Sequence, residues 1–335
     1  MLSHRLRNAL PLSGVASTPL HSKTKSRKIT LWPRIAVTAA AIIVLVSAGL
    51  LFFKFSSTPL KYYFDDIAPG TSGATLTLAN GKEIHIKDAD TGLIANEPGI
   101  RITRAADGKI IYQITETATE SNGINTLKTA NGQQAEVILA DGSLVQLNAA
   151  SSLKYSFSFK GQQQRIVELS GEGFFQVQKD KQHPFIVKSR AQQIEVLGTQ
   201  FNVNAYPSDY MIKTTLVEGS IKLSVDELKS ETLIPGQQAA INGNTIQIEN
   251  VEVEYALAWQ KGYFMFNDES LEQIMQKLAR WYNIQPVFED PSLKKRVFFG
   301  SISKFENISK VLHIMELTNV ASFDIVDNQI IISKK

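Results

Sequence analysis

The chain has 335 residues, no cysteine and a formal net charge of +3. Residues 1–34 carry seven basic and no acidic residues, so the rest of the chain has a net charge of −4. This mildly acidic remainder has no basic stripe of the kind that binds nucleic acid, and the lack of cysteine excludes disulfides, thiolate chemistry and cysteine-ligated zinc. With 43% apolar residues, the chain is long enough to bury a core and to form two domains.

A run of nineteen residues without a charge, residues 35–53, follows the basic leader. As a helix rising about 1.5 Å per residue it would be about 28 Å long, close to the roughly 30 Å of a bilayer core. We therefore expect a single transmembrane helix at residues 35–54. A cleaved signal peptide is an alternative, but its apolar region is usually about 7 to 15 residues and a small-residue cleavage site follows it. A buried helix of a soluble core is another, but such a helix seldom runs this long without a polar face.

The flanks of this run predict its direction. Short segments rich in Lys and Arg stay on the cytoplasmic side of a membrane. We therefore expect residues 1–34 to be a basic cytoplasmic leader and the chain after residue 54 to lie outside. The expected localisation is the cytoplasmic membrane, crossed once.

Residues 60–254 show the pattern of an all-β domain. Short alternating runs are separated by Asn-Gly and Asp-Gly pairs, which tolerate the positive φ that tight hairpin turns require. No ten-residue stretch there keeps a helical period. A sandwich, a barrel and a short solenoid would each produce this pattern, and all three stay open. The turn pairs are Asn80-Gly81, Asp107-Gly108, Asn131-Gly132, Asp141-Gly142 and Asn242-Gly243.

Residues 262–335 have a different character and predict a small α+β domain. Apolar residues recur at helical spacing in residues 270–282, with Asp268 as the expected N-cap, and again in residues 307–318. Each helix has an apolar strand before it and another after it, which gives a doubled β-α-β unit with a weak repeat at a 37-residue offset. The expected strands are residues 263–266, 284–288, 297–302, 321–326 and 329–333.

We find no signature of catalysis, so the prediction is a protein that is not an enzyme. The five histidines lack metal-ligand spacing, and the glycine-rich residues 170–173 lack the lysine and the helix of a phosphate loop. Two acidic pairs could be cast as general acid and base, but acidic neighbours in strands and turns are nearly always solvated charges. These pairs are Asp65/Asp66 and Glu168/Glu172. No catalytic residue, cofactor site, cofactor or metal site is therefore predicted.

Many ordered motifs carry a resemblance to a known family. They read LTLANG, LVQLNAASSLKY, VELSGEGFFQV, HPFIV, VLGTQFNVNAY, TTLVEGSIKLS and LIPGQQAAI, and they continue through residues 258–264 and LARWYNI. In these motifs the chain resembles the FecR family of membrane-bound anti-sigma factors, in the version that accompanies nutrient-uptake transporters in Bacteroidetes. The C-terminal part resembles the family's region related to the signalling domain of secretins and TonB-dependent transporters.

This resemblance implies a transmembrane signal relay. In the family, a TonB-dependent outer-membrane transporter presents a periplasmic signalling domain to the C-terminal part of the regulator, and a cytoplasmic domain then controls an extracytoplasmic-function sigma factor. The implied localisation is the bacterial inner membrane, with the N-terminus cytoplasmic and the C-terminal domains periplasmic. One departure is the 34-residue leader, which is shorter than the family's helical sigma-binding domain. Either the start lies too far downstream, or the chain is a truncated paralogue.

The expected partner interface lies in the C-terminal module, where an edge strand could pair with the transporter's domain. The candidate residues are Phe264, Phe266, Phe298 and Phe299, each of which could instead belong to the core. The alternative function is a membrane-tethered periplasmic protein that binds a glycan or another envelope polymer. In that case Tyr206 and Tyr210, beside Pro207, could stack on sugars.

Overall fold

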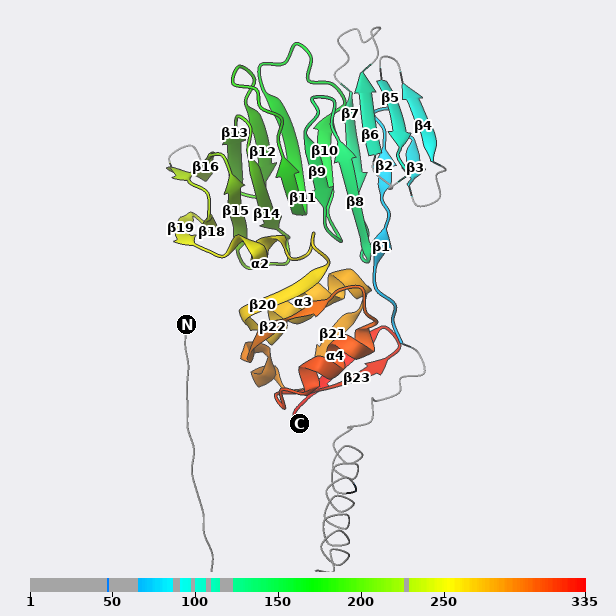
Figure 1. Ribbon diagram of the computed structural model, residues 1–335, viewed down its shortest axis with the longest axis vertical. Helices are drawn as coiled ribbons and strands as arrows, with labels where there is room; N and C mark the ends of the chain where they lie inside the picture. Colours follow the sequence, from blue (N-terminus) through cyan, green and yellow to red (C-terminus); the bar gives the residue numbers. More distant parts are fainter. Residues whose placement is uncertain are drawn as a thin grey trace, which may run out of the picture. The chain divides into compact units, whose positions relative to one another are not determined.

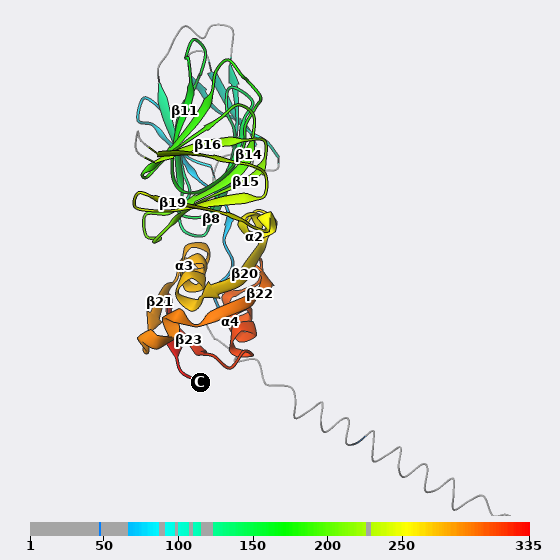
Figure 2. The same ribbon diagram turned by 90° about the vertical axis from the view of Figure 1, so that its left-hand side faces the viewer.

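The computed structural model describes Ser47 and residues 66–86, 91–97, 100–106, 110–114, 123–225 and 229–335. The chain divides into two compact units, Met1–Leu60 and Lys61–Lys335. Apart from Ser47, all described residues belong to the second unit, which Figures 1 and 2 show in two views.

Most of this unit is β-sheet, arranged as two ladders of strands. Alternating apolar residues in each ladder point into one shared core, so the ladders pack face to face, and Figure 2 shows them as two layers. The first ladder runs in the order β3 (Glu83–His85), β2 (Thr75–Thr77), β7 (Ile124–Lys128), β10 (Ser152–Ser156), β11 (Arg165–Gln176), β12 (Phe185–Ser189), β13 (Gln192–Val196), β16 (Ile221–Val225) and β17 (Lys229–Leu233). The second runs in the order β4 (Gly92–Glu97), β5 (Ile100–Arg104), β6 (Ile110–Ile114), β8 (Gln133–Ile138), β9 (Leu144–Leu147), β11, β14 (Gln200–Ala205), β15 (Ile212–Glu218), β18 (Gln237–Asn242) and β19 (Thr245–Asn250).

Strand β11 belongs to both ladders. Its first part pairs with β10 and β12, and its second part, from Gly171, pairs with β9 and β14. Gly171 has φ +96°, a conformation that glycine adopts without steric cost, and it lies where the strand passes from one ladder to the other. Phe175, beyond this bend, stacks on Phe201 with ring centroids 5.1 Å apart in the shared core. We call β1 (Thr71–Ser72) to β19 the β region.

The C-terminal module, residues 263–333, packs two helices with two small sheets around a second apolar core. It contains β20 (Tyr263–Ser270), α3 (Leu271–Tyr282), β21 (Gln285–Phe288), a 3₁₀ turn (Pro291–Lys295), β22 (Val297–Ser303), α4 (Ile308–Glu316), β23 (Ser322–Val326) and β24 (Gln329–Ser333). Strand β20 pairs with β22, and β24 lies between β21 and β23.

The predicted helices in this module are confirmed as α3 and α4, because one apolar face of each lies in the core. The predicted N-cap of α3 was wrong. Ser270, not Asp268, caps the helix, and a reciprocal bond with Gln273 completes a capping box. One short helix, α2 (Val253–Leu257), was not predicted and crosses the expected end of the β domain at residue 254. The expected domain boundaries otherwise stay a prediction.

The predicted fold class needs a correction in its first part. In the segments that the structure describes, no helix is long and apolar enough to cross a membrane. The longest of them, α3, has 12 residues and one polar face, whereas a span needs about 20 apolar residues. Residues 35–54, where the transmembrane helix was expected, lie outside the described residues apart from Ser47. The fold that the structure gives is mostly β-sheet, with the helices α2, α3 and α4.

Replacing Gly171 with alanine is expected to destabilise the β region strongly. A Cβ there would lie 2.4 Å from the buried Ser151 Oγ, in addition to the cost of a positive φ. We expect a loss of about 2 to 4 kcal/mol in the free energy of unfolding, measured by urea denaturation. Gly142→Ala is the matched control, because its φ is also positive but nothing lies within 4 Å, and it should cost about 1 kcal/mol. Equal losses in the two variants would show that the bend in β11 is not tightly packed.

Candidate functional site at the junction of the two regions

An arginine of the C-terminal module binds the β region directly. Arg280, in the last turn of α3, donates from Nη1 to Asp209 Oδ1 over 2.9 Å and from Nη2 to Oδ2 over 3.4 Å. Its guanidinium carbon also lies 3.8 Å from the centroid of the Tyr206 ring. A paired and stacked arginine of this kind fixes orientation as well as contributing energy. The tyrosine is held in turn, because its hydroxyl donates to the Ala149 carbonyl oxygen over 2.7 Å.

A buried lysine forms the second polar contact between the regions. Lys304 follows β22, is only 3% exposed and donates from Nζ to Gln134 Oε1 on β8. The ammonium lies 4.0 Å from the Trp281 ring centroid, and Trp281 Nε1 donates to the Lys304 carbonyl oxygen over 2.7 Å. Burial lowers the pKa of Lys304 from 10.5 to about 7, and the negative charge of Glu172 opposes this shift.

A row of amide side chains covers the outer face of the second ladder near these contacts. Glu172, on β11, accepts from Asn148 Nδ2 over 2.8 Å and from Asn202 Nδ2 over 3.0 Å. Trp259, in the segment between α2 and β20, donates from Nε1 to Asn202 Oδ1 over 3.2 Å. The linker to the C-terminal module is thereby fixed to the β region, and Gln260 adds a bond to Gln146. The expectation that the Glu168/Glu172 pair is solvated was wrong for Glu172, which is buried and held by two asparagines.

The segment that leads into the β region also contacts the C-terminal module. We call residues 66–72 the strap. Asp66 accepts from the Ser309 backbone N–H over 3.1 Å and from the Ser309 hydroxyl over 2.7 Å, at the start of α4. Four residues later, Gly70 lies against the Trp281 ring, and Thr71 donates to the Gly132 carbonyl oxygen over 2.7 Å. Asp66 therefore caps the start of α4, which is a structural role and not that of a catalytic acid or base.

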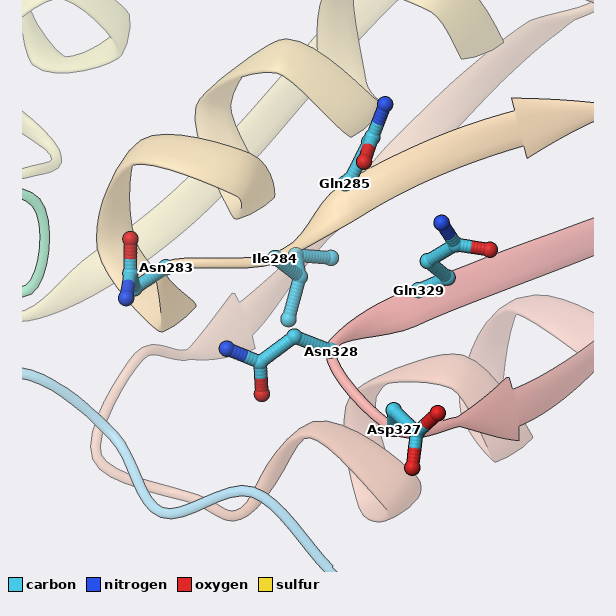
Figure 3. Close-up of a pocket in the computed structure, with 6 residues that line it drawn as sticks. All are labelled: Asn283, Ile284, Gln285, Asp327, Asn328 and Gln329. Carbon is cyan, nitrogen blue, oxygen red and sulfur yellow. The ribbon is translucent and has the colours of Figure 1, made fainter.

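A small depression lies beside the junction and is shown in Figure 3. Its volume is about 420 Å³, and the lining comes from the end of α3, the start of β21 and the turn before β24. Asp327 is the only titratable group in the lining, the others being amides and one isoleucine. Among the described residues, no cluster of His, Cys, Asp and Glu could hold a metal ion. The lining residues are Asn283, Ile284, Gln285, Asp327, Asn328 and Gln329.

The four phenylalanines predicted as a partner interface do not share one environment. Phe264, Phe266 and Phe298 lie in the core of the C-terminal module, whereas Phe299 is 67% exposed. The neighbouring residues of β20 and β22 alternate between core and surface, which explains the split. Their role in binding a partner stays a prediction, and the accessible member of the set is Phe299.

The pair of aromatic residues proposed for sugar stacking needs a correction. Tyr206 is 3% exposed, because Arg280 covers its ring and its hydroxyl bonds to the backbone. Burial, followed by the negative charge of Glu172, raises the pKa of Tyr206 above its ordinary value. Tyr210 alone of the two is exposed.

The sequence interpretation did not identify the junction residues. Arg280 and Lys304 stand out in the chain only by position: Arg280 directly precedes the core residue Trp281, and Lys304 directly follows an apolar strand. A charged residue placed inside an apolar pattern is the signal that could have indicated a buried polar contact. Asp209, the partner of Arg280, lies in a turn, where an acidic residue is ordinary.

Comparison with known proteins gives consistent matches. The sequence model described as "FecR protein" matches residues 125–222, and the one described as "FecR, C-terminal" matches residues 263–332. Two solved structures from Parabacteroides distasonis ATCC 8503, at 2.50 Å and 1.65 Å resolution, are of a protein described as a candidate anti-sigma factor. Each is 27% identical to this chain with a TM-score of 0.59, and the alignment covers 63% of this chain and 99% of the other. No curated protein matches the chain.

The chain belongs to the FecR family, as its sequence motifs predicted. Members of this family are regulatory proteins rather than enzymes. Within the family, the chain is a sigma-regulating signal transducer of the anti-sigma kind, which acts through contacts with sigma factors or signalling partners.

The buried Lys304 is expected to make stability depend on pH. The unfolded chain keeps the Lys304 proton up to its ordinary pKa of 10.5, whereas the folded chain releases it near 7. Between these values the unfolded state binds more protons, so the stability of the wild type relative to Lys304→Met should rise with pH, by up to about 1.4 kcal/mol per pH unit. Below about pH 7 the difference should be flat. Urea denaturation from pH 6 to 10 measures this, and parallel profiles for the two proteins would contradict it.

Proposed function

We propose that this protein relays a signal from a TonB-dependent outer-membrane transporter to an extracytoplasmic-function sigma factor. In this proposal the C-terminal module receives the signal by binding the transporter's periplasmic signalling domain. Membership of the FecR family supports the regulatory half of the proposal. The transporter half is supported by the surface of the module.

The observation that carries the proposal is an apolar strip on β20 and β22. Val297, Phe299, Ser301 and Ser303 alternate on one side of β22, while Phe298 and Ile302 on the other side are buried. Tyr263 pairs with Ser303 in the β20–β22 ladder, so it shares the outer side. Of these, Phe299 is 67%, Val297 48% and Tyr263 47% exposed. Exposed aromatic and aliphatic groups on one sheet face suit burial against another protein.

The strand edge next to this strip adds backbone groups for binding. In the described part of the C-terminal module, β22 pairs with β20 and with no second strand. An unpaired strand edge can accept an added strand, in which backbone hydrogen bonds supply affinity and neighbouring side chains supply specificity. A partner strand lying along β22 would cover Val297 and Phe299 at the same time.

The proposal includes no catalysis and no cofactor. The junction consists of packed and hydrogen-bonded groups, and in the described ranges of the chain the depression in Figure 3 joins no acid to a base. A glycan-binding role is not proposed, because Tyr206 is covered by Arg280 and leaves Tyr210 without the second aromatic residue that the idea required.

We further propose that the β region and the C-terminal module lie in the periplasm. The basic leader supports this location, because such segments stay in the cytoplasm. The chain has no cysteine, so a single cysteine at Tyr210 would be the only thiol. We expect this variant to react in intact cells with a maleimide that passes the outer but not the inner membrane. Labelling only after lysis would contradict a periplasmic location.

Replacing Phe299 with serine is expected to abolish signalling without unfolding the protein. The side chain is mostly exposed, so the free energy of unfolding should change by less than about 0.5 kcal/mol. Binding to the isolated signalling domain of the cognate transporter should weaken by at least tenfold in titration calorimetry, since aromatic anchors dominate interfaces. A reporter driven by the cognate sigma factor should then stop responding to the transporter's substrate.

Two controls make this result decisive. Phe298→Ser, one residue earlier, removes a buried group and should lower the melting temperature, because Phe298 lies in the core of the module. A Phe299→Ser protein that binds and signals normally would refute the strip as the interface. Unchanged reporter output after deletion of the whole gene would refute the regulatory proposal itself.

A further inference from the structure

The strap supplies the N-terminal cap of a helix that lies more than 240 residues away. Asp66 accepts three hydrogen bonds at the start of α4: from the Ser309 N–H over 3.1 Å, from its hydroxyl over 2.7 Å and from Asn307 Nδ2 over 3.0 Å. The next residue continues the contact, because the Ile308 N–H donates to the Ile67 carbonyl oxygen over 3.0 Å. A carboxylate at this place satisfies free N–H groups and interacts favourably with the helix dipole.

Helix α4 depends on this contact because the side chain of its own N-cap residue accepts no hydrogen bond from the first turn of the helix. Asn307 occupies the N-cap position, but its side chain makes no capping bond within the helix and instead donates to Asp66. The helix is nine residues long, which is too short to be stable in water by itself. The strap therefore completes α4 from outside the module, and the half-buried Ile67 adds apolar contact with the module's core.

The same strap is fixed to the junction between the β region and the C-terminal module. Gly132, just before β8, accepts at its carbonyl oxygen from the Thr71 N–H over 2.7 Å and donates from its N–H to the Arg280 carbonyl oxygen over 2.8 Å. Gly70 fits closely between Gly132 and Trp281, since a Cβ on it would lie 2.6 Å from the Gly132 oxygen and 2.8 Å from the Trp281 ring. The strap, the end of α3 and the start of β8 are thus joined at one place.

We propose that the strap is a latch whose release is coupled to the separation of the C-terminal module from the β region. Moving α3 away from β8 would break the Gly132 bond to Arg280 and remove the Trp281 surface on which Gly70 rests. Losing these contacts would leave the strap divided, with Asp66 and Ile67 on the module and Thr71 and Ser72 paired with β8. Conversely, releasing Asp66 would uncap α4 and loosen the module from its other side. The strap directly follows residue 65 in the sequence, so the latch would link the state of the module to the chain that precedes it.

This coupling does not depend on which partner the module binds. It follows from contacts within one chain, and linkage requires that it act in both directions by the same free energy. The amides of the strap and of Gly73, the residues before β8 and the first turn of α4 should therefore exchange hydrogen as one unit, although they come from three distant parts of the sequence.

Hydrogen exchange on the full chain tests the first direction with Asp66→Ala. We expect exchange to become roughly fivefold faster at residues 66–73 and at 307–310, as for the loss of one helix cap, and also faster at residues 130–134 of the β region. Asp290→Ala is the matched control. Asp290 caps the 3₁₀ turn of the same module by accepting from the Ser292 N–H over 2.8 Å, and it does not touch the strap. The control should leave residues 66–73 and 130–134 unchanged.

The reverse direction is tested with Arg280→Ala, which removes the ion pair and the stacking at the junction without touching the strap's own side chains. It should speed exchange severalfold at residues 66–73 and at Ser309. Lys277→Ala is its control, because Lys277 lies one turn earlier on α3 and pairs with Glu269 over 2.7 Å inside the module. The latch is refuted if Asp66→Ala affects only residues 307–310, or if Arg280→Ala leaves the strap as protected as in the wild type.

Discussion

The backbone of Gly132 joins the three parts of the structure. Its carbonyl oxygen accepts from the strap, and its N–H donates to the last turn of α3. Both bonds need the three backbones to lie very close together, which is why residues without side chains, Gly70 and Gly132, meet there. The β region, the C-terminal module and the strap consequently meet at one point, Gly132.

Around this contact, the junction between the β region and the C-terminal module is formed mainly by polar contacts rather than apolar ones. Arg280 pairs with Asp209 and covers Tyr206, Lys304 reaches Gln134, and Trp259 donates to Asn202. Polar contacts of this type depend strongly on geometry, and they leave hydrated surfaces when they open, which an apolar interface would not. Two folded regions held in this way can form a defined arrangement and can also separate at modest free-energy cost. A regulator that must respond to a partner needs both properties.

The elements that local pattern determines could be predicted from the sequence. Helices α3 and α4 follow from apolar residues such as Leu271 and Ile308 at helical spacing, and the turn pair Asp141-Gly142 joins the hairpin of β8 and β9. The pair Asn131-Gly132 forms no hairpin, because it joins strands of different ladders. FecR membership followed from ordered motifs. The expected membrane span finds no counterpart among the helices that the structure describes, and its residues lie outside the described ranges apart from Ser47. The choice among sandwich, barrel and solenoid needed the strand pairings, which no periodicity encodes.

Contacts between distant segments could not be predicted in the same way. Asp66 appears in the sequence as one of two adjacent acids, and nothing near it indicates a helix start 243 residues away. Glu172 alternates like a surface residue of β11, yet Asn148 and Asn202 enclose it because the linker with Trp259 covers that face of the sheet. Tyr206 likewise resembles an exposed residue in the sequence, but the guanidinium of Arg280 covers its ring. Each case depends on which elements pack together, and a single sequence carries no local signal for that.

Both ends of α4 are completed by residues near the two ends of the second unit. Asp66 caps its start, and Lys335 Nζ donates to the Glu316 carbonyl oxygen over 2.9 Å at its end. During synthesis at about 5 to 20 residues per second, Asp66 is added roughly 12 to 50 seconds before Ser309, which is 243 residues later. Closure of this helix is thus a late event in the synthesis of the described chain, and the strap has no helix to cap until Ser309 has been made.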